Sequence, residues 1–401
     1  MKRQLLGVAA ILLSISTYAQ DNPLWMRYCA ISPDGTTIAF TYKGDIYTVP
    51  STGGRASQIT TNPAHDTKPI WSPDGKKIAF ASDRMGSMDI FEVNKEGGIP
   101  KRLTTHSGNE TPVAYKDAGH ILFLANIMPT AEDAQFPSGQ FQQVYEVNTE
   151  GGRPILFSSM PMEDISINHT GNTLLYHDKK GYEDPWRKHH TSSITRDIWL
   201  CSLNGNRTFR KQTAFNGEDR TPVWASDDKS FYYLSEEKGS FNIFKRDIDG
   251  NTSKQITNHT KHPVRFLSAA SNGTLCYGYD GEIYTVKEGA IPQKVQISIV
   301  TDKNDKDLIR QIKRSGATEI SLSPDAKEIA FVLRGDVYVT STEYSTTKQI
   351  TNTPQQERDI HFSPDGRSIV YAAERNGLWQ IYQTSLAKKE EKQFAYATDI
   401  K

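Results

Sequence analysis

A short turn sequence that recurs along the chain is the strongest constraint on its fold. Ser72-Pro73-Asp74-Gly75 has close copies that start at Ser32, Ser323 and Ser363. Proline presets φ, the Ser and Asp side chains can bond nearby backbone N–H groups, and glycine accepts the positive φ that closes a hairpin. The motif therefore predicts a turn. We do not expect Ser72 and Asp74 to be a nucleophile and its base, because no histidine repeats beside these turns.

Weaker copies of the turn begin at Lys116, Asn168, Ser226 and Ser271, which makes eight repeat units. Each unit continues with an apolar strand, an aromatic strand and a closing strand. Four short antiparallel strands per repeat are the signature of a β-propeller blade, which buries both its faces only when neighbours pack against it. A solenoid of stacked β-coils is the alternative, disfavoured because its coils are usually shorter.

The repeats divide unevenly along the chain. Six units fill Leu24 to Ile299, and two more follow a charged stretch from Thr301 to Gly316. The fold class predicted is all-β, with a six-bladed β-propeller of SPDG-type (WD40-like) repeats followed by the first two blades of a second, incomplete propeller. The predicted boundaries are 1–19 for a signal peptide, 20–299 for the first propeller, 300–316 for a linker and 317–401 for the two further blades. Because two blades cannot close a ring, we expect a longer polypeptide or an assembly.

The N-terminus is typical of a secretory signal peptide. Lys2 and Arg3 precede an apolar run from Leu5 to Ile15, and cleavage is expected after Ala19. The run is too short to span a bilayer, so we expect an exported, periplasmic protein with no membrane span; a buried N-terminal element is the alternative. Basic and acidic residues balance at 47 each, which argues against a nucleic-acid partner. The three cysteines predict no structural zinc and at most one incidental disulfide.

Three features together resemble the N-terminal region of exported tricorn-type serine proteases. The first is a signal peptide followed by six repeats. The second is the stretch GYEDPWRKHHTSSITRDIW (Gly181 to Trp199). The third is the stretch SGATEISLSPDAKEIAFVLRGDVYVTS (Ser315 to Ser341), which opens a second propeller. The resemblance implies propeller channels for peptides, rings closed without an interlocking strand, and a catalytic serine, histidine and glutamate far beyond residue 401. SPDG repeats also occur in the Tol-system propeller protein and in prolyl oligopeptidase-like enzymes.

The chain itself offers no catalytic constellation. It contains no Gly-x-Ser-x-Gly elbow, no His-Glu-x-x-His pair and no phosphate loop. We therefore predict no catalytic residues, no metal site and no cofactor within these 401 residues, and we expect them to be inactive alone. Whether the protein is an enzyme depends on the serine peptidase region that the resemblance implies.

Two insertions stand out on the face opposite the SPDG turns. One runs from Asn126 to Gln142 and contains Phe136; the other runs from His177 to Arg196. The second insertion contains Trp186, Arg187, His189 and His190. Insertions gathered on one face of a repeat protein often build its binding surface, so these residues are candidates for peptide binding or gating. The alternative is that the aromatic side chains only pack each insertion against its own blade.

Acidic residues recur near the start of the predicted innermost strands. They are Asp66, Glu110, Asp164 and Asp219. A ring of acids at a channel mouth could attract the amino terminus or the basic side chains of a peptide. The alternative is that each acid bonds backbone or an adjacent blade. Arg84 and Arg375, after the second strand of their blades, are expected to form ion pairs within the blade rather than to contact a peptide carboxylate.

The leading functional hypothesis is a non-catalytic propeller part of a tricorn-like serine peptidase. It would gate peptides or unfolded polypeptides and guide them to a C-terminal peptidase region of the same parent protein. The alternative is a periplasmic Tol-type propeller that acts as a protein-interaction module. The sequence leaves the formation of a homo-oligomer open.

Overall fold

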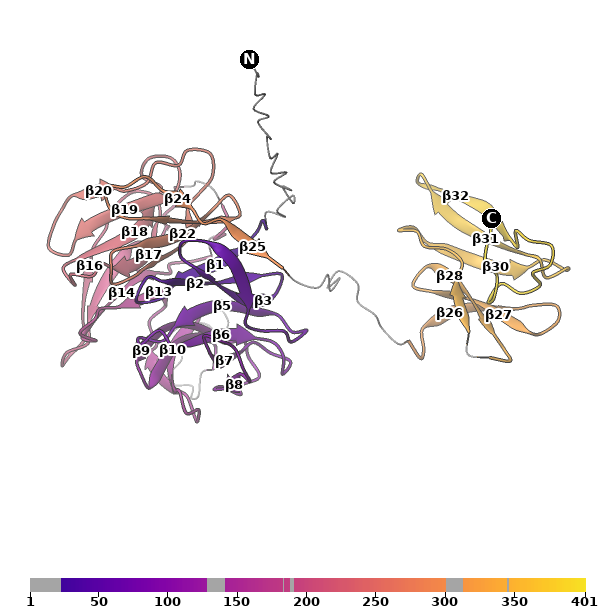
Figure 1. Ribbon diagram of the computed structural model, residues 1–401, viewed down its shortest axis with the longest axis horizontal. Helices are drawn as coiled ribbons and strands as arrows, with labels where there is room; N and C mark the ends of the chain where they lie inside the picture. Colours follow the sequence, from indigo (N-terminus) through magenta and orange to yellow (C-terminus); the bar gives the residue numbers. More distant parts are fainter. Residues whose placement is uncertain (1–22, 128–140, 183, 188–190, 301–312, 345) are drawn as a thin grey trace, which may run out of the picture. The chain divides into compact units, whose positions relative to one another are not determined.

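The computed structural model describes residues 23–127, 141–182, 184–187, 191–300, 313–344 and 346–401. The chain divides into two compact units, residues 1–306 and 307–401 (Figure 1). The described residues form strands, turns and loops, and no helix among them is long and apolar enough to cross a membrane. The all-β prediction is therefore confirmed.

The first unit contains six sheets among its described residues, which we call blades 1 to 6 in chain order. Blade 1 contains β1 (Arg27–Ile31), β2 (Thr37–Tyr42), β3 (Asp45–Pro50), β4 (Gly54–Gln58) and the late strand β25 (Ile297–Ile299). Blade 2 contains β5 (Asp66–Trp71), β6 (Lys77–Ser82), β7 (Asp89–Asn94) and β8 (Lys101–Arg102). Blade 3 contains β9 (Thr111–Asp117), β10 (His120–Ala125), β11 (Gln143–Asn148) and β12 (Ile155–Ser158).

Blades 4 to 6 repeat the same antiparallel order. Blade 4 contains β13 (Met162–Ile167), β14 (Thr173–Asp178), β15 (Ile198–Ser202) and β16 (Thr208–Lys211). Blade 5 contains β17 (Asp219–Trp224), β18 (Ser230–Ser235), β19 (Asn242–Asp247) and β20 (Ser253–Gln255). Blade 6 contains β21 (Arg265–Ala269), β22 (Leu275–Tyr279), β23 (Glu282–Val286) and β24 (Gln293–Lys294).

The first strand of each blade forms the inner wall of a ring. These innermost strands are β1, β5, β9, β13, β17 and β21, and each contacts the next, with β21 returning to β1. Apolar cores lie between adjacent blades; one joins Phe40 of blade 1 to Cys276 of blade 6. Two tryptophans also link neighbours, since Trp71 Nε1 donates to Ala30 O at 2.8 Å and Trp224 Nε1 donates to Ser166 O at 3.0 Å. Each blade thus completes its core only with its neighbours, as expected of a propeller.

The Ser-Pro-Asp-Gly segments are hairpin turns between the first two strands of their blades. Ser72 Oγ donates to Asp74 Oδ1 at 2.7 Å and accepts a bond from the Lys77 backbone N–H at 2.9 Å. Gly75 has φ +67°, and its N–H donates to Ser72 O at 2.9 Å. The hydrogen bond from Ser72 and the backbone N–H of Lys76 lower the pKa of Asp74, so this carboxylate acts as an acceptor inside the turn.

Blade 1 carries a fifth strand that comes from the far end of the ring. Strand β25 runs parallel to β4, with Ile297 opposite Gly54 and Ile299 opposite Ala56, and Gly54 N–H donates to Gln296 O at 2.8 Å (Figure 1). The family resemblance implied closure without an interlocking strand, and this pairing corrects that expectation for this chain. Strand β25 thereby pairs outer backbone groups of β4, whereas the outermost strands of blades 2 to 6 have no such partner among the described residues.

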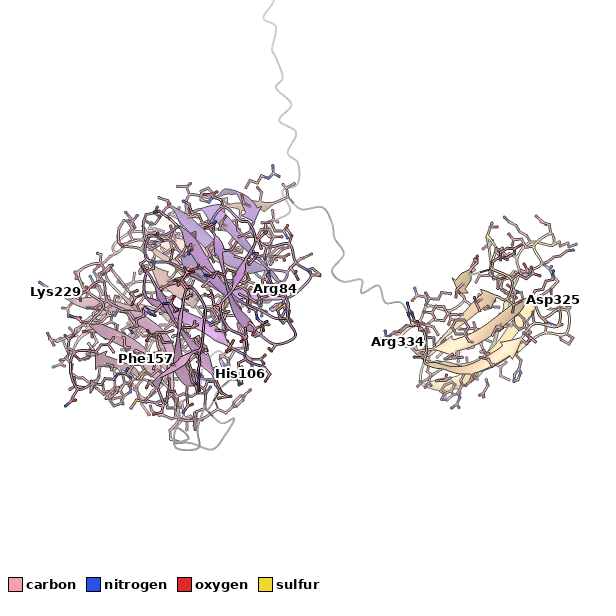
Figure 2. The ribbon with its side chains drawn as sticks, turned by 90° about the horizontal axis from the view of Figure 1, so that it is seen from below. Arg84, His106, Phe157, Lys229, Asp325 and Arg334 are labelled. Atoms are coloured by element: carbon pink, nitrogen blue, oxygen red, sulfur yellow. The ribbon has the colours of Figure 1, made fainter. Side chains whose placement is uncertain are left out.

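The second unit contains two sheets. One contains β26 (Ala317–Leu322), β27 (Glu328–Leu333), β28 (Asp336–Ser341) and β29 (Thr347–Gln349); the other contains β30 (Glu357–Phe362), β31 (Ser368–Arg375) and β32 (Leu378–Ser385). Figure 2 shows Asp325 and Arg334 at opposite ends of this unit, because they belong to successive hairpins. Large apolar side chains stay exposed on β26 and β32, among them Ile320 at 75% and Ile381 at 81%.

Candidate functional site

A cavity of about 660 Å³ lies along the inner wall of the first unit. Residues of all six innermost strands line it, together with Tyr182, Pro185 and Trp186 of the insertion between β14 and β15. Its size is within the usual range for a ligand pocket. The cavity is therefore the best candidate site in the part of the chain that is described.

A bulge recurs at the same place in most innermost strands and sets which side chains enter the cavity. Five residues there adopt a positive φ between +48° and +56°: Tyr28, Lys68, Asp164, Thr221 and Phe266. At each of them the pairing with the second strand skips a residue. A positive φ is unfavourable for a residue with a side chain, and bulges often re-aim side chains at binding sites. All five residues line the cavity.

The wall from blade 4 is acidic, and its acids are hydrogen-bonded to their neighbours. Glu163 lies 2.7 Å from Lys179 Nζ and 3.2 Å from His177 Nε2. Burial raises the pKa of Glu163, but the hydrogen bonds and positive charges of His177 and Lys179 outweigh it and hold the pKa well below its usual range. Asp164 Oδ2 accepts a hydrogen bond of 2.6 Å from Thr221 Oγ1 of blade 5. Glu163 is thus paired with cationic side chains, whereas the hydrogen-bond partner of Asp164 is a neutral hydroxyl.

The wall from blades 1 and 2 carries cations without such partners. Neither Arg27 nor Lys68 makes an ion pair with any described residue. The Lys68 ammonium lies 5.9 Å from the ring centroid of Tyr28, and the Arg27 guanidinium lies 4.9 Å from that of Trp186. Burial lowers the pKa of Lys68, while the charge of Asp164 across the cavity opposes that shift. The charges of Arg27 and Lys68 are therefore not paired with a carboxylate of the described residues.

Pro185 and Trp186, which belong to the insertion of blade 4, line the cavity and are held by arginines of other blades. Pro185 O accepts hydrogen bonds from Arg220 Nη1 at 3.0 Å and from Arg265 Nη1 at 2.5 Å, and Trp186 O accepts one from Arg265 Nη2 at 2.7 Å. The guanidinium groups of Arg27 and Arg265 lie 4.9 and 5.1 Å from the centroid of the Trp186 indole. Blades 1, 5 and 6 therefore all hold a segment that belongs to blade 4.

Arg187 anchors the insertion in a buried ion cluster of blade 5. It bonds Glu218 and lies 3.3 Å from Glu236, and both carboxylates are fully buried. Arg196 Nη1 donates to Glu218 at 3.0 Å. Burial alone would raise the pKa of Glu218. The positive charges of Arg196, Arg220 and Arg187 outweigh burial and lower this pKa, so the carboxylate is ionised. Arg187 thus positions Trp186 and does not itself line the cavity.

Three of the four predicted acids are buried and are not among the residues that line the cavity. Asp66 is fully buried, and both its oxygens lie 3.0 Å from Arg84 Nη2. Glu110 and Asp219 are also buried, and burial raises the pKa of each to about 7. The partner of Asp66 is thus Arg84 of its own blade, whereas the alternative expectation was a bond to backbone or to an adjacent blade. Arg84 and the equivalent Arg375, which lies 2.6 Å from Glu357, form the ion pairs expected of them.

Asp164 is the exception, because it is out of register with the other acids. In blade 2, Asp66 lies opposite Ser82, the last residue of the second strand. In blade 4 the residue at this strand position is Met162, which lies opposite Asp178. Asp164 comes two residues later and falls on the bulge. Phe136, His189 and His190 lie outside the described residues. The sequence analysis missed Tyr28, Lys68, Arg220, Arg265 and Phe266, and a strand alignment anchored on the turns would have grouped them.

Comparison with known proteins assigns the fold to a family. The family model of the tricorn protease N-terminal beta propeller domain matches residues 23–290. The chain belongs to this family. That confirms the resemblance drawn from the repeats and the propeller fold of the first unit.

Relatives and solved structures agree with this membership. The chain is 24% identical over 387 residues to tricorn protease homolog 1 of Streptomyces coelicolor, covering 94% of this chain and 34% of that protein. It is 27% identical over 295 residues to the tricorn protease homolog of Saccharolobus solfataricus, covering 70% and 26%. The crystal structure of the tricorn protease matches with a TM-score of 0.62 and 18% identity, over 90% of this chain and 34% of that one. The chain thus spans about a third of the relatives it matches.

Proposed function

We propose that this chain is the non-catalytic propeller part of an exported, tricorn-like serine peptidase. It selects peptides or unfolded polypeptides and guides them to a catalytic region outside these 401 residues. Membership of the tricorn propeller family supports the link to a peptidase. The exposed apolar faces of β26 and β32 are suited to pack against further blades of such a protein.

The observation that carries the proposal is how the inner wall binds a segment of the chain itself, Pro185 and Trp186, at the cavity. Arg220 and Arg265 hold the carbonyl groups of Pro185 and Trp186, which are backbone groups that any polypeptide possesses. A site that binds backbone carbonyls through arginines and an aromatic side chain through cation–π contacts can accept a peptide of variable sequence. Trp186, exposed by 44%, is placed to contact such a peptide or to restrict its passage.

The proposal is tested with the purified chain and a fluorescein-labelled, unstructured peptide. We expect peptide binding by fluorescence anisotropy, and we expect Trp186→Ala to change the affinity by about fivefold or more, since one exposed cation–π contact is worth about 1 kcal/mol. Trp379→Ala is the matched control, because Trp379 is similarly exposed but lies in the second unit. Equal effects of the two substitutions would count against gating at this cavity.

Two further measurements separate this proposal from its alternative. In the full-length protein, Trp186→Ala should alter cleavage of long peptides more than that of short ones, and the isolated chain should hydrolyse no fluorogenic peptide. Binding of a folded periplasmic protein without any peptide binding would instead favour a Tol-type interaction module. Export is tested by N-terminal sequencing of the mature protein, which is expected to begin at Gln20.

A further inference from the structure

Two of the three cysteines lie together at the seam between blade 1 and blade 6. Cys29 belongs to β1, the first strand of the propeller, and Cys276 belongs to β22 of the last blade. Strand β1 contacts both β21 and β22, and the two cysteines are members of one apolar core. Cys201 of β15 belongs to a different core. The closed ring therefore brings together two thiols from opposite ends of the first propeller.

The contacts around both cysteines place them next to each other across the seam. Cys29 Sγ donates to Phe266 O at 3.4 Å, and Ile31 N–H of the same strand donates to Ser268 Oγ at 3.0 Å. Ser268 lies opposite Cys276 in the pairing of β21 with β22, and its Oγ donates to Cys276 O at 3.4 Å. Burial raises the pKa of the Cys276 thiol well above its usual range, and the neighbouring Cys29 thiol raises it further. Such an effect requires that the two sulfur atoms lie close together.

A covalent link at this place would hold the ring closed. A disulfide stabilises a protein mainly by restricting the unfolded chain, and more so when it closes a longer loop. Most of the first propeller lies between Cys29 and Cys276. Strand β25 closes the same seam at the outer edge of blade 1 through backbone hydrogen bonds. A link between β1 and β22 would close it from the inner side.

We propose that Cys29 and Cys276 form an intramolecular disulfide that joins blade 1 to blade 6 and stabilises the closed ring in the exported protein. The oxidising compartment is taken from the proposed function, since thiols in the cytosol are kept reduced. The oxidant is an organic disulfide, such as oxidised glutathione or the active-site disulfide of an oxidoreductase.

The link forms by two exchange steps. The thiolate of one cysteine attacks the organic disulfide, forms a mixed disulfide and releases one thiol. The thiolate of the other cysteine then attacks the mixed disulfide and releases the second thiol. The two cysteines lose two protons and two electrons in total, and the organic disulfide is reduced to two thiols.

Burial sets the time at which the link forms. In the folded chain Cys29 is 4% exposed and Cys276 is fully buried. The thiolate is the reactive form of cysteine, and the raised pKa keeps the buried Cys276 thiol protonated. Oxidation therefore takes place while blade 6 packs against blade 1, and the same burial then protects the link from reductants.

The test folds the full chain from denaturant in a mixture of reduced and oxidised glutathione, and in parallel in reductant alone. Free thiols are alkylated under denaturing conditions, and tryptic peptides are analysed by mass spectrometry. In the oxidised sample we expect the peptide of Cys29 linked to that of Cys276, with Cys201 as the alkylated cysteine. The oxidised chain should melt about 5 °C or more above the reduced chain, because the link closes a long loop.

Substitutions separate the pair from the third cysteine. Cys201→Ala should leave both the link and the difference in melting temperature unchanged, whereas Cys29→Ala should abolish both. Alkylation of all three cysteines in the oxidised sample would overturn the proposal, as would a link that involves Cys201. A link without a rise in melting temperature would refute its stabilising role.

This test is independent of peptide binding. Failure of the link leaves the proposed peptide handling standing, and a chain that binds no peptide can still form the link. The comparison of the oxidised and reduced unaltered chain also requires no substituted protein to fold.

Discussion

The closing strand of the ring makes a sharp prediction at one glycine. Gly53 has φ +91°, and a Cβ at this position would lie 2.6 Å from the backbone oxygen of Gln296. Gly97 occupies the equivalent turn of blade 2 with φ +94°, but its nearest neighbour, Ile59 O, would lie at 3.8 Å, an ordinary contact. Replacement of either glycine by alanine therefore carries the same conformational cost, about 1–2 kcal/mol. Only Gly53→Ala must also displace β25.

That displacement sets the additional cost. The Gln296 carbonyl accepts the hydrogen bond of 2.8 Å from Gly54 N–H, so moving it weakens the first contact between β4 and β25. The loss of one or two such bonds adds about 1–3 kcal/mol, since a net hydrogen bond contributes about 1 kcal/mol. We expect Gly53→Ala to destabilise the closure by about 2–5 kcal/mol in total and Gly97→Ala to destabilise its own turn by about 1–2 kcal/mol.

Hydrogen exchange followed by mass spectrometry distinguishes the two effects. In the Gly53→Ala chain, peptides that cover Gln296 to Ile299 should lose protection, while Gly97→Ala should leave them as protected as in the unaltered chain. Thermal unfolding of both variants gives the global cost. Equal protection of these peptides in the two variants would refute the argument that β25 holds the ring through this contact.

Two other predictions concern buried acids. Arg84→Met should lower the free energy of unfolding of the first unit by about 3 kcal/mol in urea, because it leaves the Asp66 carboxylate buried without its ion pair. Adding Asp66→Asn should restore stability, and a loss of stability below about 1 kcal/mol in Arg84→Met would contradict this. Glu110 is a pH-dependent case, because burial raises its pKa from 4.5 to about 7. The stability that the protonated form contributes is therefore lost as pH rises from about 4.5 to 7. Glu110→Gln should make the melting temperature less dependent on pH over that window, and a pH dependence unchanged from that of the unaltered chain would disprove the argument.

The turns and strands could be predicted because their determinants are local. Proline, glycine and the serine–aspartate bond fix the turn at Ser72 whatever surrounds it, and the apolar strands follow at a constant distance. The closing strand could not be assigned in this way. Ile297 to Ile299 were grouped with the sixth repeat, but β24 already completes that blade, and their parallel partner lies more than two hundred residues earlier in the chain.

The candidate site was harder to predict because its residues share the bulge position of their strands but differ in amino-acid type. Asp66 and Asp164 look equivalent in sequence, but a difference of two places in register puts the first under Arg84 and the second in the cavity. Lys68 could not be recognised, since nothing in the residues around it marks a bulge. Trp186 was singled out as part of an insertion, but its contacts with Arg265 depend on how blade 4 reaches across to blade 6.

The bulges also remove the rotational symmetry that the repeats give to the ring. Five equivalent positions around the axis present Tyr28, Lys68, Asp164, Thr221 and Phe266, so no rotation of one blade onto the next restores the same lining. A molecule in the cavity would therefore meet a different chemical group in each direction. Six similar blades thus produce an opening that can distinguish the sides of its ligand, which a symmetric pore cannot do.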